Sequence, residues 1–234
     1  MLVNGKRIPY IEAMHNRQGE RISVKLMVFD LDGTLADTGA DLAGSVNRTL
    51  QSLGIPTRPD AEILGFVGDG VRKLIERALG EPHRDRFTEA LERFNGIYAD
   101  HLLDHTGLYP GVTDVLRHFG GKDMVLITNK GLDFTLALCR GLGIAGFFKQ
   151  IIAGDSNEFM KPDPRLLAPL FEAFKAGPAE TLIVGDGVND ILLARNTGAR
   201  SCAFLNGLGK REDLLRLGPD FTIERMIDLK EIAF

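Results

Sequence analysis

The stretch that most constrains the fold is residues 24–38, which read V-K-L-M-V-F-D-L-D-G-T-L-A-D-T. An apolar run covers residues 24–29 and stops at Asp30, and Asp32 follows two positions later. A run of about six large and β-branched residues is typical of a strand buried on both faces of a parallel sheet. An aspartate at the carboxyl end of such a strand lies where open α/β sheets bind ligands, and Gly33 allows a sharp turn beside it. The alternative is a solvated acidic turn, because Asp-Gly pairs are common in turns.

The second half of the chain alternates short apolar segments with amphipathic ones. This order predicts a doubly wound parallel sheet of the α/β class, with helices between the strands. We expect strands at residues 124–128, 150–153, 181–185, 200–205 and 220–223, and helices at residues 112–119, 132–142, 164–175, 188–197, near Glu212 and 224–232.

Residues 38–107 lack that alternation. Helical spacing recurs at residues 40–53, after Pro59, and at residues 71–79 and 86–103, with no strand between them. We therefore expect an all-α domain of residues 38–107 inserted into an α/β core of residues 22–37 and 108–234. Residues 1–21 form an N-terminal extension, in which Asn4-Gly5 predicts a hairpin.

Composition excludes several classes of protein. The chain has 234 residues, enough for an α/β core and an insertion, and its net charge of -4 argues against a general nucleic-acid binder. No apolar stretch has the length of a membrane span, and the N-terminus lacks the apolar segment of a secretory signal. Cys139 and Cys202 show no metal or redox spacing, so we interpret them as buried residues in a reducing, cytoplasmic setting.

Two further segments carry residues suited to phosphate. Thr128 and Asn129 end an apolar strand just before a helix, where a hydroxyl and backbone N–H groups form a phosphate site, although an ordinary helix cap uses the same residues. Lys161 lies in F-M-K-P-D-P ahead of another helix, and an unremarkable surface lysine is the alternative there.

A fourth segment, L-I-V-G-D-G-V-N-D at residues 182–190, repeats the pattern of an apolar strand ending in an acid. Its acids are Asp186 and Asp190, one helical turn apart. A dinucleotide G-x-G-x-x-G motif is rejected, because Asp190 occupies the position of the third glycine. Carboxylates gathered at adjacent strand ends repel one another unless one takes up a proton or a dication binds them. Mg²⁺ is the natural dication beside a phosphate.

These four segments, in this order, resemble the motifs of the haloacid dehalogenase-like superfamily, and the resemblance covers residues 22–234. It implies a Mg²⁺-dependent phosphomonoester hydrolase with an aspartyl-phosphate intermediate, in which Asp30 is the nucleophile and Asp32 the general acid and base. It also implies that the phosphoryl group is bound by Thr128, Asn129 and Lys161, and the metal by Asp30, Asp32 (through its backbone carbonyl), Asp186 and Asp190. Asp32 argues against dehalogenation, because a halide leaves without a proton and the dehalogenases of the superfamily lack this residue.

The helical insertion corresponds to the cap that selects the leaving group in this superfamily. Within it, V-G-D-G-V-R-K-L-I-E-R-A-L at residues 67–79 resembles the specificity loop of phosphoglycolate phosphatases. Gly68 and Gly70 are then expected to approach the substrate, and Arg72 or Lys73 to meet its carboxylate. The alternatives are a glycine turn before a solvated helix face, and a Schiff-base role for Lys73 as in phosphonate-cleaving relatives.

We therefore expect an enzyme that hydrolyses a small phosphorylated metabolite, 2-phosphoglycolate first. The alternatives are a phosphotransferase similar to β-phosphoglucomutase, a phosphatase for another sugar phosphate, a nucleotide or pyrophosphate, and a non-catalytic binding module. Neither nucleic acid nor a membrane is expected as a partner, and we expect a monomer or a homodimer.

Overall fold

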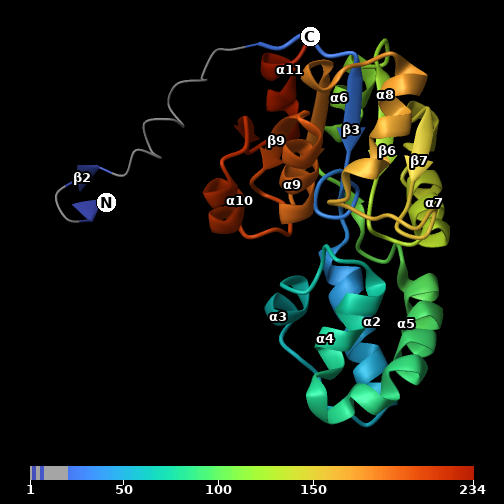
Figure 1. The fold of residues 1–234 in the computed structure, drawn as a ribbon. Helices are drawn as coiled ribbons and strands as arrows, with labels where there is room; N and C mark the ends of the chain where they lie inside the picture. Colours follow the sequence, from blue (N-terminus) through green and yellow to red (C-terminus); the bar gives the residue numbers. More distant parts are fainter. Residues whose placement is uncertain (1, 4–5, 8–20) are drawn as a thin grey trace.

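A six-stranded parallel sheet forms the centre of the computed structural model, which describes residues 2–3, 6–7 and 21–234 (Figure 1). The strand order is β10-β9-β8-β3-β6-β7, and every neighbouring pair is parallel. The strands are β3 (Leu26–Phe29), β6 (Asp123–Ile127), β7 (Gln150–Ile152), β8 (Thr181–Gly185), β9 (Arg200–Phe204) and β10 (Phe221–Ile223). The predicted doubly wound α/β sheet is confirmed, with β3 in its interior.

Helices cover both faces of the sheet because successive side chains of each strand point to opposite sides. Met27 and Phe29 of β3 share one apolar cluster with α6 (Val112–His118), α7 (Leu132–Gly141) and α11 (Leu229–Ile232). Leu26 and Val28 share the other with α8 (Ala168–Phe174) and α9 (Val188–Thr197). A smaller cluster joins α9 to α10 (Arg211–Leu217). These faces make β3 fully buried, as its apolar run predicted.

The helices between β3 and α6 lie together beyond the carboxyl ends of the strands (Figure 1). We call them the helical group: α2 (Gly39–Ser52), α3 (Asp60–Leu64), α4 (Val71–Leu79), η1 (Glu81–Arg86) and α5 (Phe87–His101). The two chain connections to the sheet pair as short antiparallel strands, β4 (Ala36–Asp37) and β5 (Gly107–Leu108), which the sequence did not predict. The predicted run of helices without a strand is confirmed for residues 39–101.

Two predicted helices are interrupted. Residues 164–175 form η3 (Pro164–Leu166) and then α8, whose second residue is Pro169 and so supplies no N–H to continue a helix from η3. Residues 224–232 form η5 (Met226–Asp228) before α11, and the Asp228 side chain accepts the Arg225 backbone N–H at 3.2 Å.

The N-terminal extension, the cysteines and the character of the helices can also be compared with expectation. In the N-terminal extension, β1 (Leu2–Val3) pairs antiparallel with β2 (Lys6–Arg7), as a hairpin at Asn4-Gly5 requires; the rest of that prediction lies outside the described residues. Cys139 and Cys202 are buried and free, as predicted. None of the helices in the described part of the chain has the length and apolar character that a membrane crossing requires.

Candidate active site

Three neighbouring strands deliver three of the predicted site residues to one edge of the sheet. Asp30, Thr128 and Asp186 follow β3, β6 and β8, and β3 pairs directly with both of the other strands. Carboxyl ends of adjacent parallel strands meet at the same edge, so residues from distant parts of the sequence become neighbours. The helical group lies over this edge (Figure 1).

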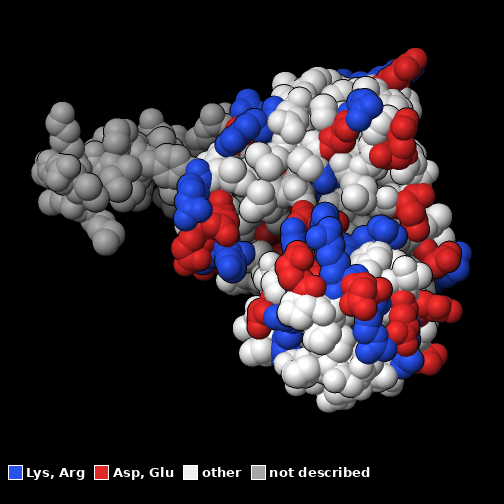
Figure 2. Space-filling model, turned by 60° about the horizontal axis from the view of Figure 1, so that its bottom comes forward, with Lys and Arg blue, Asp and Glu red and all other residues white. Residues whose placement is uncertain are grey.

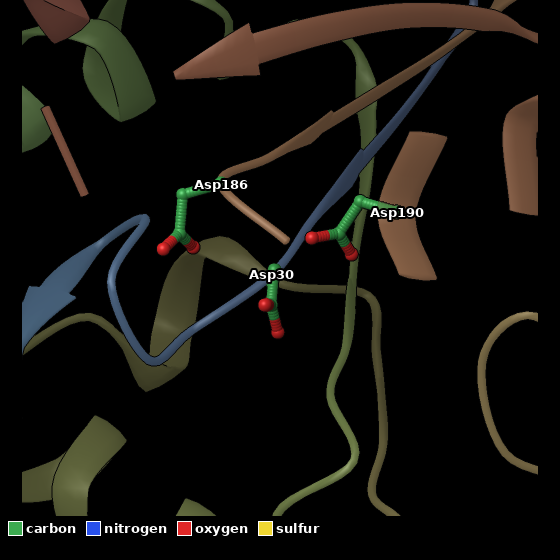
Figure 3. Close-up of side chains that lie close together, drawn as sticks. All are labelled: Asp30, Asp186 and Asp190. Atoms are coloured by element: carbon green, nitrogen blue, oxygen red, sulfur yellow. The ribbon is translucent and has the colours of Figure 1, made fainter. Parts of the chain in front are cut away.

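Three carboxylates form a compact acidic cluster there. Figure 3 shows Asp30 between Asp186 and Asp190, the last of which lies in the first turn of α9. One carboxylate oxygen of each residue lies within 4.8 Å of those of the other two. The structure thus brings together the side chains predicted to hold a metal, while the Asp32 side chain points elsewhere.

Hydrogen bonds fix the direction of the Asp186 carboxylate. Thr34 Oγ1 donates to Asp186 Oδ1 at 2.6 Å, and the backbone N–H groups of Leu208 and Gly209 donate to Oδ2 at 2.8 and 3.0 Å. The Asp186 N–H donates back to Thr34 Oγ1 at 2.9 Å. Sequence reasoning gave Thr34 no role, although its place two positions after Asp32 marked it as part of the motif.

Glycines make room for this carboxylate. A Cβ atom on Gly33 would lie 2.2 Å from Asp186 Oδ2, and one on Gly207 would lie 2.2 Å from the Gly33 carbonyl oxygen and 2.4 Å from Asp186 Cβ. Gly33 also has φ of +79°, which side-chain-bearing residues rarely adopt. The backbone can therefore close around Asp186 only where side chains are absent.

Lys161 is the counter-charge inside the acidic cluster. Its buried ammonium lies 2.7 Å from Asp30 Oδ1 and 2.6 Å from Asp190 Oδ1. The Asp190 contact is a hydrogen bond, whereas the Asp30 contact lacks hydrogen-bond geometry. Asp30 Oδ1 is thus a buried carboxylate oxygen with no hydrogen-bond partner among the described residues, aimed into the cluster.

Burial, and to a smaller extent neighbouring negative charge, shifts the pKa values of the cluster. Burial raises the pKa of Asp30 from 3.8 to about 8; the Lys161 ammonium opposes the rise, and the charges of Asp190 and Asp186 add to it. Burial likewise raises the pKa of Asp186 to about 6, against the opposing hydrogen bond from Thr34. Burial alone would lower the pKa of Lys161, but Asp190 and Asp30 hold it above its ordinary value.

The cluster fits a bound dication. Three carboxylates and one ammonium carry a formal charge of -2 when all are ionised, and the donors are oxygens, the ligands that Mg²⁺ prefers. Asp30 Oδ1 lies 2.7 Å from the Lys161 ammonium without a directed hydrogen bond, so it keeps lone pairs with which it can bind a metal. A dication would neutralise the cluster and oppose the rise of the two carboxyl pKa values, which burial causes first and repulsion between the carboxylates increases.

Asn129 holds two loops rather than pointing its side chain at the acidic cluster. Its Nδ2 donates to the Lys161 carbonyl at 3.0 Å and to the Gly68 carbonyl at 2.9 Å, and its Oδ1 accepts the Lys161 N–H at 2.9 Å. The neighbouring Thr128 hydroxyl accepts the Lys130 N–H at 3.3 Å and keeps its own proton free to donate. Both residues are buried at the sheet edge, as predicted, but the Asn129 side chain acts on the protein backbone.

Asp32 occupies a different environment from Asp30. Its Oδ1 accepts from Thr38 Oγ1 at 2.7 Å, and Lys130 Nζ lies 3.1 and 3.2 Å from its two oxygens. Lys130 also donates to Tyr98 Oη of α5 at 2.8 Å, so this buried network joins the sheet to the helical group. Burial raises the pKa of Tyr98 to about 12, which keeps its hydroxyl protonated. Sequence reasoning missed Lys130; its place directly after Thr128 and Asn129 was the available signal.

Two cavities meet at Asp30, Asp32 and Lys161. The first lies under the helical group and is also lined by Gly68, Gly70 and Lys130. The second lies on the Asp186 side. We call them the cap-side cavity and the metal-side cavity. Gly68 and Gly70 thus line the same cavity as Asp30 and Asp32, and their approach to the substrate stays a prediction.

The structure does not bring Arg72 and Lys73 to either cavity. They line a separate surface depression, where Lys73 Nζ pairs with Glu76 at 2.7 Å and the Arg72 guanidinium stacks on Phe87 at 4.8 Å. On the face in Figure 2, basic and acidic side chains lie side by side, in keeping with such surface pairs. Val71 and Leu74 of α4 line the cap-side cavity, whereas Arg72 and Lys73 lie on another face of the same helix, which spacing alone could not reveal.

Comparison with known proteins is consistent with this arrangement. Residues 27–204 match the model of the family described as haloacid dehalogenase-like hydrolase. A phosphoglycolate phosphatase of Vibrio parahaemolyticus is 36% identical over 221 residues, covering 90% of this chain and 96% of that protein. One of Nitrosococcus oceani is 32% identical over 215 residues, covering 89% and 96%. A crystal structure from Haemophilus somnus, described as a predicted phosphoglycolate phosphatase, superposes with a TM-score of 0.85 at 28% identity, covering 89% of this chain and 97% of that one.

Proposed function

The chain belongs to the haloacid dehalogenase-like hydrolases, and from this premise we propose that it is a Mg²⁺-dependent phosphatase acting on 2-phosphoglycolate. The observation that carries the proposal is that two carboxylates of one cavity lie in different environments. Asp30 lies in the acidic cluster beside Lys161, whereas Asp32 lies in a network with Thr38 and Lys130. Carboxyl groups held in such different environments can serve different steps of one reaction.

In the first step, a carboxylate oxygen of Asp30 attacks phosphorus, and the bond from phosphorus to the leaving oxygen breaks. Asp32 gives its proton to that oxygen and releases an alcohol. In the second step, Asp32 takes a proton from water, which attacks the aspartyl-phosphate and regenerates Asp30 with release of phosphate. The Thr128 hydroxyl and the Lys161 ammonium stabilise charge on the transferred phosphoryl group.

The metal would be held by the carboxylates of Asp30 and Asp186, by the backbone carbonyl of Asp32, and by Asp190 in support. When bound, it supplies positive charge that keeps Asp30 ionised and screens the phosphoryl oxygens from the carboxylates. Asp186 is oriented for this role by Thr34 and by two backbone N–H groups.

We also propose that residues 38–107 act as a cap on a core of residues 22–37 and 108–234, with residues 1–21 as an extension. Contacts across this boundary involve the site itself: Asn129 and Asn189 both donate to the Gly68 carbonyl, at 2.9 and 3.1 Å, and Lys130 donates to Tyr98. A cap that closes in this way excludes water and selects the leaving group.

The test is phosphate release from a panel of small phosphomonoesters with Mg²⁺, comparing the wild type with Asp30→Asn. We expect a preference for 2-phosphoglycolate that the substitution abolishes. Release spread over sugar phosphates or nucleotides would contradict the substrate, and transfer to a sugar phosphate without release would identify a mutase. No metal-dependent release from any ester would contradict the phosphatase proposal.

A further inference from the structure

Resting on the proposed function, we infer that Lys130 binds a carboxylate on the leaving group and thereby selects anionic phosphomonoesters. This assignment replaces the one that the sequence pattern suggested for Arg72 and Lys73. Four features of the structure support it: the place of Lys130 beside Asp32, the apolar character of the cavity, the double contact of the ammonium with Asp32, of which one can be exchanged, and the engagement of the other cations.

The leaving group must lie next to Asp32, because Asp32 delivers the proton to the leaving oxygen. Lys130 Nζ lies 3.1 and 3.2 Å from the two carboxylate oxygens of Asp32, so it is the cation at that position. In 2-phosphoglycolate a single methylene separates the leaving oxygen from the carboxylate. A carboxylate so close to the leaving oxygen lies within reach of an ammonium that contacts the proton donor.

The cap-side cavity offers little else to an anion. Its walls are mainly apolar side chains of the helical group and of α7: Val67, Val71, Leu74, Phe94 and Phe134. Among the described residues that line it, Lys130 and Lys161 are the cations, and Lys161 is already paired with Asp30 and Asp190. A buried charge without a partner is costly in an apolar cavity, so an anionic group there requires Lys130.

Lys130 can accommodate a further acceptor by giving up one of its two contacts with Asp32. The three donors of the ammonium point to the two Asp32 oxygens, at 3.1 and 3.2 Å, and to Tyr98 Oη at 2.8 Å. One donor suffices to hold Asp32, so a substrate carboxylate can take the other. The ammonium also lies 4.6 Å from the Tyr98 ring centroid, so the aromatic face supports its charge on one side. Although burial alone would lower the pKa of Lys130, Asp32 holds it above its ordinary value, and the group stays charged.

Cations elsewhere around the site are less suited to bind a carboxylate on the leaving group. Lys73 lies on the surface in its pair with Glu76. Arg77 and Lys210 line the metal-side cavity, and Arg77 pairs with Asp69 at 2.5 Å. Neither of these two residues lines the cavity that contains Lys130.

The experiment compares 2-phosphoglycolate with 2-hydroxyethyl phosphate, which has the same skeleton with a neutral hydroxymethyl group in place of the carboxylate. Lys130→Met removes the charge and keeps the chain length. We expect the ratio of kcat/KM for the two esters to fall by roughly 10- to 100-fold in this variant, as for loss of a buried charged hydrogen bond. Lys130→Arg should retain most of the ratio, and Tyr98→Phe, which keeps the ammonium, should lower both rates together.

Matched variants carry the same substitution at lysines outside the cap-side cavity, Lys73→Met and Lys210→Met. If either matched variant loses the preference for 2-phosphoglycolate over 2-hydroxyethyl phosphate while Lys130→Met keeps it, the inference is wrong. A wild type without a preference for 2-phosphoglycolate would instead contradict the proposed substrate, so the two failures are distinguishable.

Binding provides a second measurement if Lys130→Met folds but does not turn over. Calorimetry with the non-hydrolysable 3-phosphonopropionate and its neutral analogue 3-hydroxypropylphosphonate should show the same loss of discrimination. If Lys130→Met does not fold, as judged by circular dichroism, Lys130→Gln takes its place in both assays. Equal discrimination by wild type and variant in this assay would overturn the inference.

Discussion

Thr34 and Asp186 are hydrogen-bonded to each other twice, although 152 positions separate them in the chain. The hydroxyl of Thr34 donates to Asp186 Oδ1 at 2.6 Å, and the backbone N–H of Asp186 donates back to the same hydroxyl at 2.9 Å. The pair joins the loop after β3 to the end of β8, and it fixes a carboxylate that we assign to the metal. A short side chain from the first motif thus controls the geometry of the fourth.

Removing this hydroxyl should weaken metal binding. In Thr34→Val the Asp186 carboxylate loses a buried hydrogen bond worth about 1.5–3 kcal/mol. We expect the Mg²⁺ concentration for half-maximal activity to rise about tenfold or more, with a smaller change in kcat at saturating Mg²⁺. Thr34→Ser is the matched control, since it keeps the hydroxyl. An unchanged Mg²⁺ requirement in Thr34→Val would show that the bond does not orient a metal ligand.

The metal-free protein should lose stability as the pH rises. The folded-state pKa values of Asp30 and Asp186 are raised to about 8 and about 6, above the ordinary 3.8, so between these values the folded chain holds protons that the unfolded chain has released. Unfolding free energy therefore falls with increasing pH across that window. Thermal melts from about pH 5 to pH 9 in a chelator should show a falling Tm.

Mg²⁺ and a neutral substitution provide the controls for these melts. Bound Mg²⁺ keeps the carboxylates ionised, so it should raise Tm more at the alkaline end of the range and flatten the slope. Asp30→Asn removes the most strongly shifted carboxyl group and should flatten the slope without metal. A metal-free Tm that rises with pH would contradict the assignment of uncompensated charge to this cluster.

The glycines around Asp186 should not tolerate a methyl group. In Gly207→Ala the new Cβ would lie 2.2 Å from the Gly33 carbonyl oxygen, so the backbone beside the acidic cluster must shift. Displacement of about 1 Å at a catalytic group can lower the rate about 100-fold, and we expect a loss of that order. Gly146→Ala is the matched control, because nothing lies within 4 Å of a Cβ there. Steady-state kinetics of both variants will test this expected loss of rate, with circular dichroism as a check of folding.

Asn189 should contribute to substrate binding by holding the loop of the helical group. Its Nδ2 donates to Asp69 Oδ1 at 2.9 Å and to the Gly68 carbonyl at 3.1 Å, both across the boundary to the sheet. Losing such partly exposed bonds costs about 1 kcal/mol, so we expect Asn189→Ala to raise KM roughly fivefold while kcat changes little. Asn206→Ala removes an exposed asparagine bond that stays on the sheet side, to the Glu224 carbonyl, and should leave KM as it is. Equal KM values in both variants would argue against a binding role for the loop contact.

The sequence predicted most of the sheet and the acidic cluster because both follow from local patterns. The apolar runs before Asp30, Thr128 and Asp186 identified three strands, and parallel strands place their carboxyl ends at one edge. The order of those strands and the contacts of the helical group depend on packing between distant segments. The bond between Lys130 and Tyr98 joins such segments, and nothing in the local sequence around either residue indicates the other.

The same dependence on packing between distant segments explains why the sequence pattern suggested a substrate contact for Arg72 and Lys73. Their spacing after the glycines was compatible with a substrate contact, but the direction of a helix relative to the sheet is set by packing of the whole group. Charge pattern on α4 could not distinguish a face toward the cavity from one toward solvent, where Lys73 pairs with Glu76.

One amide side chain couples the two halves of the site. Asn129 bonds the backbone of Lys161 on the sheet side and the carbonyl of Gly68 in the helical group. Movement of the Gly68 loop therefore removes a support from the segment that carries the Lys161 ammonium, which we propose binds the phosphoryl group. Thermodynamic linkage makes the coupling reciprocal: an anion that immobilises Lys161 favours the position of the Gly68 loop seen here, and a ligand that holds this loop favours anion binding by the same factor.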